Sequence, residues 1–353
     1  MSNLHAAHRE WASRPADERY PNFLTLHADA LRDKRLSKEA GISGDRIRVE
    51  ARRDDVWLRC GAQGAPLTEW AFGQVARVAG APPGYLATLS PTTAAAALNE
   101  GLDATRGGRG DYQALVRGGK ICALNGPRYS RVYDADVLDM VAPLTDRGWR
   151  PPPALARHGS PNAGLYRGQR DMFTFLVNEE HRVDDGTEGG LGRGFFLWNS
   201  EVGARSFGIS TFLYRYVCGN HIVWGATDVV ESRLRHVGSI GHRARAEVHM
   251  HLSAWAQAST AEVEAQISTA QRVVLGKGKD EVVRATVRAT GLPQSTVSSA
   301  WDGASQWVEV DGTPDTAWGM AQALTRYSQS SSWTSDRVEI DQKAGQLLRV
   351  VLS

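Results

Sequence analysis

The stretch from Gly194 to Gly225 reads GFFLWNSEVGARSFGISTFLYRYVCGNHIVWG and carries the most structural information in the chain. An aromatic run, Phe195–Trp198, stops at Asn199–Gly203, and a second apolar run follows over Ser206–Tyr216. Aromatic and β-branched runs that are bounded by glycine and asparagine are typical of hairpins. We therefore predict two strands about this turn, although the looser alternation of the second run leaves a helical end open.

The sequence on both sides of this stretch indicates the fold class. Upstream, two apolar runs flank Gly118-Gly119, a strong signal for a two-residue hairpin turn. Thr68–Ala79 has apolar residues at helical spacing, and helical periodicity dominates after Gly241. Short strands joined by hairpin turns, in place of βαβ units, predict an α+β fold. It would have a largely antiparallel twisted sheet from about residue 110 to 225, N-terminal helices and a helical C-terminal third.

Four regions are expected along the chain. They are an N-terminal arm with short strands (1–64), a helical pair plus hairpin (65–150), a central β-rich core (151–242) and a helical region (243–353). The proline-rich segment Arg147–Pro161 marks the clearest boundary. We expect the first part of the arm to pack loosely, and we expect Arg243 to about Leu275 to form one long helix.

Composition bounds the class of protein. The 353 residues are 42% hydrophobic and 23% charged, which is ordinary for a globular protein, and the net charge of +2 gives no overall basic field. Three cysteines form no disulfide framework, which fits a reducing cytoplasm. The N-terminus has no apolar core like that of a signal peptide, and no run approaches the ~18 apolar residues of a membrane span. We expect a soluble, cytoplasmic protein.

Arginines are interleaved with aromatic residues in and around the opening stretch. Single-stranded nucleic acid is commonly bound by aromatic rings that stack on bases and by basic side chains that contact phosphates. The alternative is that the rings are packed core and the arginines face solvent. The candidates for phosphate contact are Lys120, Arg193, Arg205 and Arg215; those for stacking are Tyr214, Tyr216 and Trp224; those at the edge of the aromatic core are Asn199, Asn220 and His221.

Two patterns leave an enzyme open as an alternative. Cys218-x-x-His221, with the downstream histidines His236, His242, His249 and His251, has metal-ligand residue types, although residues two apart on a helix do not share a face. The carboxylates Asp171, Glu179, Glu180, Asp184 and Asp185 could hold magnesium or simply form a solvated loop. Phosphate-loop, nucleophile-elbow and zinc-protease motifs are absent from the sequence. We assign no catalytic residue, metal or cofactor.

A third pattern favours a duplex DNA reader. In Ala289–Ser298, a glycine followed by an apolar residue and then by a valine six positions after the glycine resembles the turn of a helix-turn-helix unit. Basic residues such as Arg284 and Arg288 lie nearby. Any corner between two helices can show the same pattern.

Several motifs resemble those of the phage/plasmid-like family known as domain of unknown function 932. The turn Asn199–Ala204 resembles its NS-x-(D/E)-G-(S/A) motif, Arg215–Asn220 its R-x-V-C-x-N motif and Arg235–Gly238 its R-H-x-G motif. Val202 and His221 depart from the pattern. Weaker likeness extends over most of residues 65 to 330 and includes Thr68–Leu86, Ala123–Leu138 and Thr316–Gln329. The resemblance implies a setting in DNA metabolism and supplies no active site.

These observations together lead to a hypothesis of function. We expect a non-enzymatic DNA-binding protein of a phage or plasmid that binds single-stranded DNA and anneals or protects it during recombination. By analogy with annealing proteins we expect a homo-oligomer, either a ring or a filament. The alternatives are a metal-dependent nuclease or hydrolase and a helix-turn-helix-like regulator that binds duplex DNA.

Overall fold

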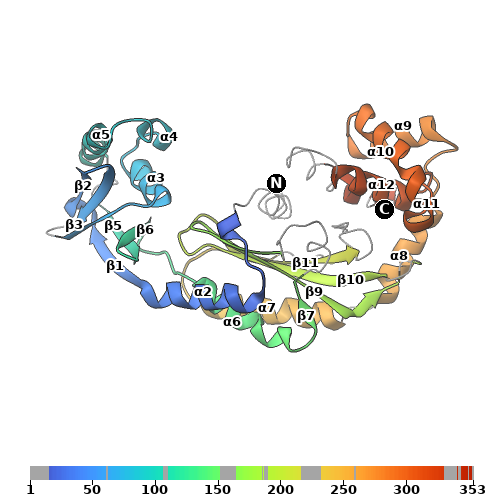
Figure 1. The fold of residues 1–353 in the computed structure, drawn as a ribbon, viewed down its shortest axis with the longest axis horizontal. Helices are drawn as coiled ribbons and strands as arrows, with labels where there is room; N and C mark the ends of the chain where they lie inside the picture. The colour runs from blue at the N-terminus through green and yellow to red at the C-terminus, as the bar shows by residue number, and fades with distance from the viewer. Residues whose placement is uncertain are drawn as a thin grey trace.

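The computed structural model describes residues 16–60, 63–105, 110–151, 164–184, 186, 190–215, 232–257, 260–329, 340, 343–348 and 350–351. These residues form an elongated, curved molecule (Figure 1). An antiparallel sheet occupies the middle, a small α/β unit lies at one end and a group of helices lies at the other. The predicted α+β class is confirmed.

The central sheet has six strands in the order β12-β11-β10-β9-β7, with β8 paired to β9. Its longest members are β9 (Met172–Val183), β10 (Leu191–Asn199) and β11 (Phe207–Arg215). The shorter strands are β7 (Trp149–Arg150), β8 (Leu165–Arg167) and β12 (Ser232–Leu234). Strands β10 and β11 pair antiparallel about the Asn199–Gly203 turn, so the predicted hairpin is confirmed and its second arm is a strand up to Arg215.

Helices cover one face of this sheet. Helices α2 (Phe23–Leu36), α6 (Asp134–Thr145) and α7 (Ile240–Gln257) lie along that side (Figure 1). Successive strand residues point to opposite faces, so Phe195 and Leu197 of β10 share a core with these helices. Burial of this apolar surface is the main stabilising term of the unit.

The opposite face of the sheet is aromatic. Phe196 stacks on Phe175 at a ring-centroid distance of 5.0 Å and lies 5.3 Å from the Trp198 ring. Each of these rings is at most 4% exposed. The rings of Phe195, Phe196, Trp198 and Phe207 are therefore packed core, as the alternative interpretation held, and they do not form an exposed platform for bases.

Gly208 is required beneath the Trp198 indole, because it pairs with Trp198 across β10 and β11 and a Cβ built on it would lie 2.0 Å from the ring. We expect Gly208→Ala to lower the free energy of unfolding by about 1–3 kcal/mol, the usual cost of overpacking a core. Urea denaturation would measure it. Gly41→Ala is the matched control, because Gly41 is also a strand glycine but its Cβ would meet nothing within 4 Å. Equal stability of the two variants would contradict the argument.

The small α/β unit, which we call the N-terminal unit, contains two three-stranded sheets. One has the order β1-β5-β6 and the other β2-β3-β4. Their strands are β1 (Ser37–Ser43), β2 (Ile47–Arg52), β3 (Asp55–Cys60), β4 (Gln63–Pro66), β5 (Asp111–Arg117) and β6 (Lys120–Asn125). The helices are α3 (Glu69–Val78), α4 (Pro83–Leu86) and α5 (Pro91–Ala104). Gly118 and Gly119 both have positive φ between β5 and β6, which confirms that hairpin turn.

The expectation of a loosely packed arm is wrong for residues 23–36. Helix α2 starts at Asn22, whose side chain accepts a hydrogen bond from the Thr25 amide, and it buries Leu26 and Ala30 completely against the central core. Strand β1 then continues directly into the small unit and pairs with β5. The segment α2–β1 thus connects the central sheet with the N-terminal unit.

The C-terminal third is helical. The expected helix over 243–275 corresponds to α7 and α8 (Thr260–Arg272), which lie on either side of residues 258–259, outside the described residues. Helix α8 ends at Arg272, where the Val273 carbonyl accepts the Ala317 amide of α12 (Ala317–Gln329) and the Leu275 amide donates to the Asp315 carbonyl. Helices α9 (Lys279–Thr290), α10 (Gln294–Ala304) and α11 (Val308–Asp311) lie between. No helix among the described residues has the length and apolar character needed to cross a membrane.

Candidate nucleic-acid interface

Two candidates of the opening stretch, Asn199 and Arg193, are buried within the fold. Asn199 has no exposed surface, and its Nδ2 donates to the Val132 carbonyl at 2.9 Å and to Asp134 Oδ1 at 2.8 Å. Arg193 is 4% exposed on the helix-covered face of β10, where burial lowers its pKa and Glu264 acts in the opposite direction. These two side chains are inaccessible to a nucleic acid in this structure, because a β10 residue is covered on both faces of the sheet.

Arg205 and Lys120 differ in their environments. Arg205 Nε lies 2.5 Å from Asp171 Oδ2, and its guanidinium lies 5.2 Å from the centre of the Phe173 ring, so an internal carboxylate already neutralises it. Lys120 is exposed at the start of β6 and remains a candidate for phosphate contact.

The other candidates cannot be placed at an interface. Tyr214 and Arg215 end β11, where their backbones pair with Gly192 and Leu191. Outside the described residues lie Tyr216, Asn220, His221 and Trp224. The candidates whose side chains the structure describes do not form one surface; they are Asn199, Arg193, Arg205 and Lys120.

Arg167 of β8 lies at the centre of a buried cluster of arginines and carboxylates. Its Nε donates to Asp134 Oδ2 at 2.9 Å, and its Nη1 donates to Asp29 Oδ2 at 3.1 Å and to Asp33 Oδ2 at 2.9 Å. Burial alone would lower the pKa of Arg167, but the carboxylates, Asp134 first, raise it. One guanidinium thus ties helix α2 to the start of helix α6.

Arg117 and Glu201 complete this acid–arginine cluster. Arg117 Nη2 donates to Glu201 Oε2, its Nη1 donates to Asp33 Oδ2 at 3.4 Å, and the second oxygen of Glu201 accepts the Asp134 backbone amide at 2.8 Å. Glu201 therefore caps the N-terminus of α6, where a carboxylate also interacts favourably with the helix dipole. Burial first, and then the charge of Glu201, raise the pKa of Asp134 to about 7.

The turn that contains Glu201 docks onto the N-terminal unit through its backbone. The Val202 carbonyl accepts hydrogen bonds from Trp70 Nε1 at 3.0 Å, Gln74 Nε2 at 3.1 Å and Asn125 Nδ2 at 3.1 Å. Since it is the carbonyl that is recognised, valine in place of the acidic residue of the family motif keeps this contact. The docking also positions the loop that follows Asn125.

That loop and the segment after β12 form a basic surface. The two segments run antiparallel: Tyr129 pairs with Val237, and the Ser130 amide donates to the His236 carbonyl at 2.8 Å. The Tyr129 ring stacks on His236 with centroids 5.1 Å apart. Burial lowers the pKa of His236 to about 4, so its imidazole is neutral at physiological pH.

Four arginines lie on these paired segments and on the first turn of α7, and we call them the arginine surface: Arg128, Arg131, Arg235 and Arg243. Arg128, Arg235 and Arg243 are exposed, and Arg243 Nη2 donates to the Val237 carbonyl at 2.5 Å. The sequence from residue 233 to 246 contains no carboxylate. A pocket of about 690 Å³ lies between the segments and is lined by Glu39, Gln113, Pro127, Arg128, Tyr129, Ser130, Arg131, Val237 and Gly238.

Sequence reasoning missed this surface although it contained a signal for it. Arg235 and the GPRYSR segment belong to the stretches that resemble the family, and arginines recur at 233, 235, 243 and 245 without an acid between them. The aromatic density of the opening stretch drew attention to residues that are mostly core. A run of arginines without neighbouring carboxylates would have been the better indicator of a surface that binds a polyanion.

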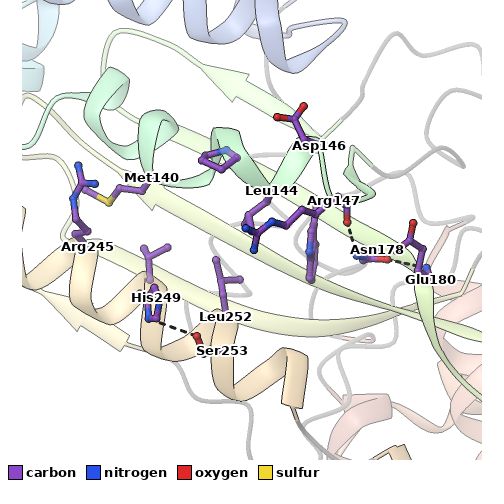
Figure 2. Close-up of a pocket in the computed structure, with 13 residues that line it drawn as sticks. Met140, Leu144, Asp146, Arg147, Asn178, Glu180, Arg245, His249, Leu252 and Ser253 are labelled. Carbon is purple, nitrogen blue, oxygen red and sulfur yellow. Dashed lines mark hydrogen bonds between the residues drawn. The ribbon is translucent and has the colours of Figure 1, made fainter.

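A second cleft, of about 850 Å³, lies between α6 and α7 (Figure 2). Met140, Leu144 and Leu252 give it an apolar lining, while Arg147 and Arg245 are accompanied by Asp146 and Glu180. The mixed charge gives no preference for a polyanion. We do not place the nucleic-acid interface here.

The residues proposed for a metal-dependent enzyme do not converge in the described part of the chain, where no group of three His, Cys, Asp or Glu side chains could hold a metal ion. His251 is buried beside Glu247 at 3.3 Å, whereas His249 is exposed and lines the second cleft. Asp171 and Asp184 lie at opposite ends of the 12-residue strand β9. Cys218, His221 and Asp185 lie outside the described residues, and the side chain of Glu179 is not described.

The helix-turn-helix pattern corresponds to two real helices. Helix α9 ends at Gly291 in the left-handed region, and α10 begins three residues later. Helix α10, in the position of a reader, contains no lysine or arginine, and its Asp302 binds Lys279 Nζ at 2.6 Å. The interpretation as a duplex DNA reader stays an alternative, but α10 lacks the basic residues expected of a recognition helix.

Comparison with known proteins gives one family match. The model described as Domain of unknown function (DUF932) matches residues 123–347, a range that contains the whole arginine surface. No curated protein and no solved structure matches the chain significantly.

Proposed function

Because the chain belongs to the DUF932 family, whose description assigns no activity, the function has to be argued from the site, and we propose that the protein binds single-stranded DNA through the arginine surface. Arginine is suited to this task, since its planar fork pairs with phosphate oxygens and remains charged. The observation that carries the proposal is that exposed Arg128, Arg235 and Arg243 gather beside residues 233–246, which contain no carboxylate.

The shape of the surface favours a single strand over a duplex. Its arginines come from two loops and the first turn of α7, and they do not follow one face of a helix that could enter a major groove. A flexible single strand can follow such an irregular surface with its phosphates. The proposed role is annealing or protection of DNA strands in recombination of a phage or plasmid, in the cytoplasm, by a ring or filament of this chain.

Binding should show the salt dependence of phosphate contacts. We expect a labelled oligothymidylate to bind in fluorescence anisotropy titrations, with log K falling linearly with log salt by about 0.7 per phosphate contacted. Replacing both Arg235 and Arg243 with glutamine should weaken binding about tenfold at low salt and make the slope less steep.

The matched control is the double replacement of Arg284 and Arg288, two exposed arginines of α9, with glutamine. This control should bind like the unchanged protein. The helix-turn-helix alternative would be favoured if none of the proteins binds single strands and the control loses binding to duplex DNA. Absence of any oligonucleotide binding at low micromolar protein would eliminate the proposal.

A further inference from the structure

Helix α7 begins next to the pocket of the arginine surface. Gly238, which lines the pocket, precedes the first helical residue Ile240 by two positions, and a Cβ built on it would meet nothing within 4 Å. The helix has 18 residues and no acidic residue in its first turn. The first amides of a helix have no intrahelical acceptors and give that end a partial positive charge, so the end attracts anions.

Arg131 supplies a second, independent indication of an anion. Its side chain is only 1% exposed, yet Nε and Nη1 have no hydrogen-bond partner; Nη2 donates to Asn125 Oδ1 at 3.3 Å. Nε lies 3.3 Å from Glu39 Oε1, but that oxygen also accepts the Tyr133 hydroxyl at 2.9 Å. A buried guanidinium with unused donors costs free energy that a bound oxyanion would offset.

The guanidinium of Arg131 is held in place by neighbouring rings. It lies 5.2 Å from the centre of the Tyr129 ring, which in turn stacks on His236, and the Tyr129 hydroxyl donates to the Ser200 carbonyl at 2.8 Å. These contacts fix the Tyr129 ring, which holds the Arg131 guanidinium at the pocket. Arg131 therefore loses little side-chain entropy when a ligand binds. Exposed Arg128 adds a second cation to the lining of the pocket.

We propose that this pocket, between Tyr129–Arg131 and Gly238 just before α7, binds one phosphate group. Its volume of about 690 Å³ is large enough for a nucleotide unit. The identification of the phosphate as part of a DNA strand rests on the proposed function. The phosphate chemistry itself rests on Arg131, Arg128 and the helix start, and a free or terminal phosphate would use the same donors.

The experiment combines two probes and three variants. Inorganic phosphate is titrated against the full-length protein at constant ionic strength, and binding is followed by phosphorus NMR line width. In parallel, oligothymidylates with a 5′-phosphate and with a 5′-hydroxyl are titrated by anisotropy. The variants are Arg128→Gln, which removes an exposed charge, Arg131→Lys, which keeps the charge but loses the fork, and the distant control Arg284→Gln.

We expect Arg128→Gln and Arg131→Lys each to weaken phosphate binding about tenfold, while Arg284→Gln has no effect. Equal weakening for both oligonucleotides would identify an internal phosphodiester; weakening confined to the phosphorylated one would identify a strand end. Phosphate binding without DNA binding would support the pocket and eliminate the proposed function. DNA binding that depends on Arg235 and Arg243 but not on Arg128 or Arg131, with no phosphate binding, would overturn the pocket and leave the proposed function intact.

Discussion

Replacement of Arg167 with methionine is expected to lower the free energy of unfolding by about 3–5 kcal/mol, the usual cost of removing one partner from a buried ion pair. Methionine keeps much of the side-chain volume, so the effect reports the lost charge. Asp134 and Glu201 are both about 4% exposed, and Asp29 and Asp33 are only partly exposed. Without the guanidinium these carboxylates repel one another where water cannot screen them.

Urea denaturation at neutral pH measures this loss. Arg48→Met is the matched control, because Arg48 also pairs with an aspartate, Asp103 at 3.2 Å, but both side chains are at least half exposed. An exposed pair contributes less than about 1 kcal/mol, so the control should unfold nearly as the unchanged protein does. A loss of less than 1 kcal/mol for Arg167→Met would show that the cluster does not depend on this cation.

The second large effect concerns the pH dependence of stability through Asp134. Its pKa rises from 3.8 when unfolded to about 7 when folded, so folding takes up a proton between these values. The stabilising contribution of the protonated carboxyl is complete below pH 4 and is lost as the pH rises towards 7. At about 1.4 kcal/mol per pKa unit, the loss is on the order of 4 kcal/mol.

Asparagine at position 134 cannot titrate, so Asp134→Asn should remove this slope. We expect the stability of the variant relative to the unchanged protein to improve steadily between pH 4 and pH 7, measured by urea denaturation at each pH. The absolute stability of the variant is lower, because asparagine cannot accept from both Arg167 and Asn199 as the carboxylate does. A constant difference across this range would mean that Asp134 is ionised in the folded protein throughout.

The acid–arginine cluster explains what the family motif does physically. Asn199 and Glu201 of the motif turn contact the start of α6, while the Val202 carbonyl binds Trp70, Gln74 and Asn125. The turn therefore joins the central sheet, the helix layer and the N-terminal unit at one place. Its residues hold the loop that presents Arg128 and Arg131, which makes the motif a support for the proposed interface.

Local sequence was sufficient for the elements whose signals are local. The aromatic run before Asn199, the Gly118-Gly119 turn and the helices over 69–78 and 279–290 follow from periodicity, turn residues and caps within a few positions. The end of α8 at Arg272 was not predictable in this way, because Val273 and Leu275 pair there with Ala317 and Asp315, which are distant in the sequence.

The sequence by itself determined the α+β class, the central hairpin and the family, because strand alternation, helical spacing and motif residues are properties of neighbours along the chain. Only the tertiary structure decided which polar residues are accessible. Ser130 and His236 are 106 positions apart, and they meet because β6 and β12 end at the same place beside the docked turn. Burial and charge pairing depend on such distant contacts, so Asn199 and Arg193 became internal while Arg128, Arg235 and Arg243 remained exposed around the buried guanidinium of Arg131.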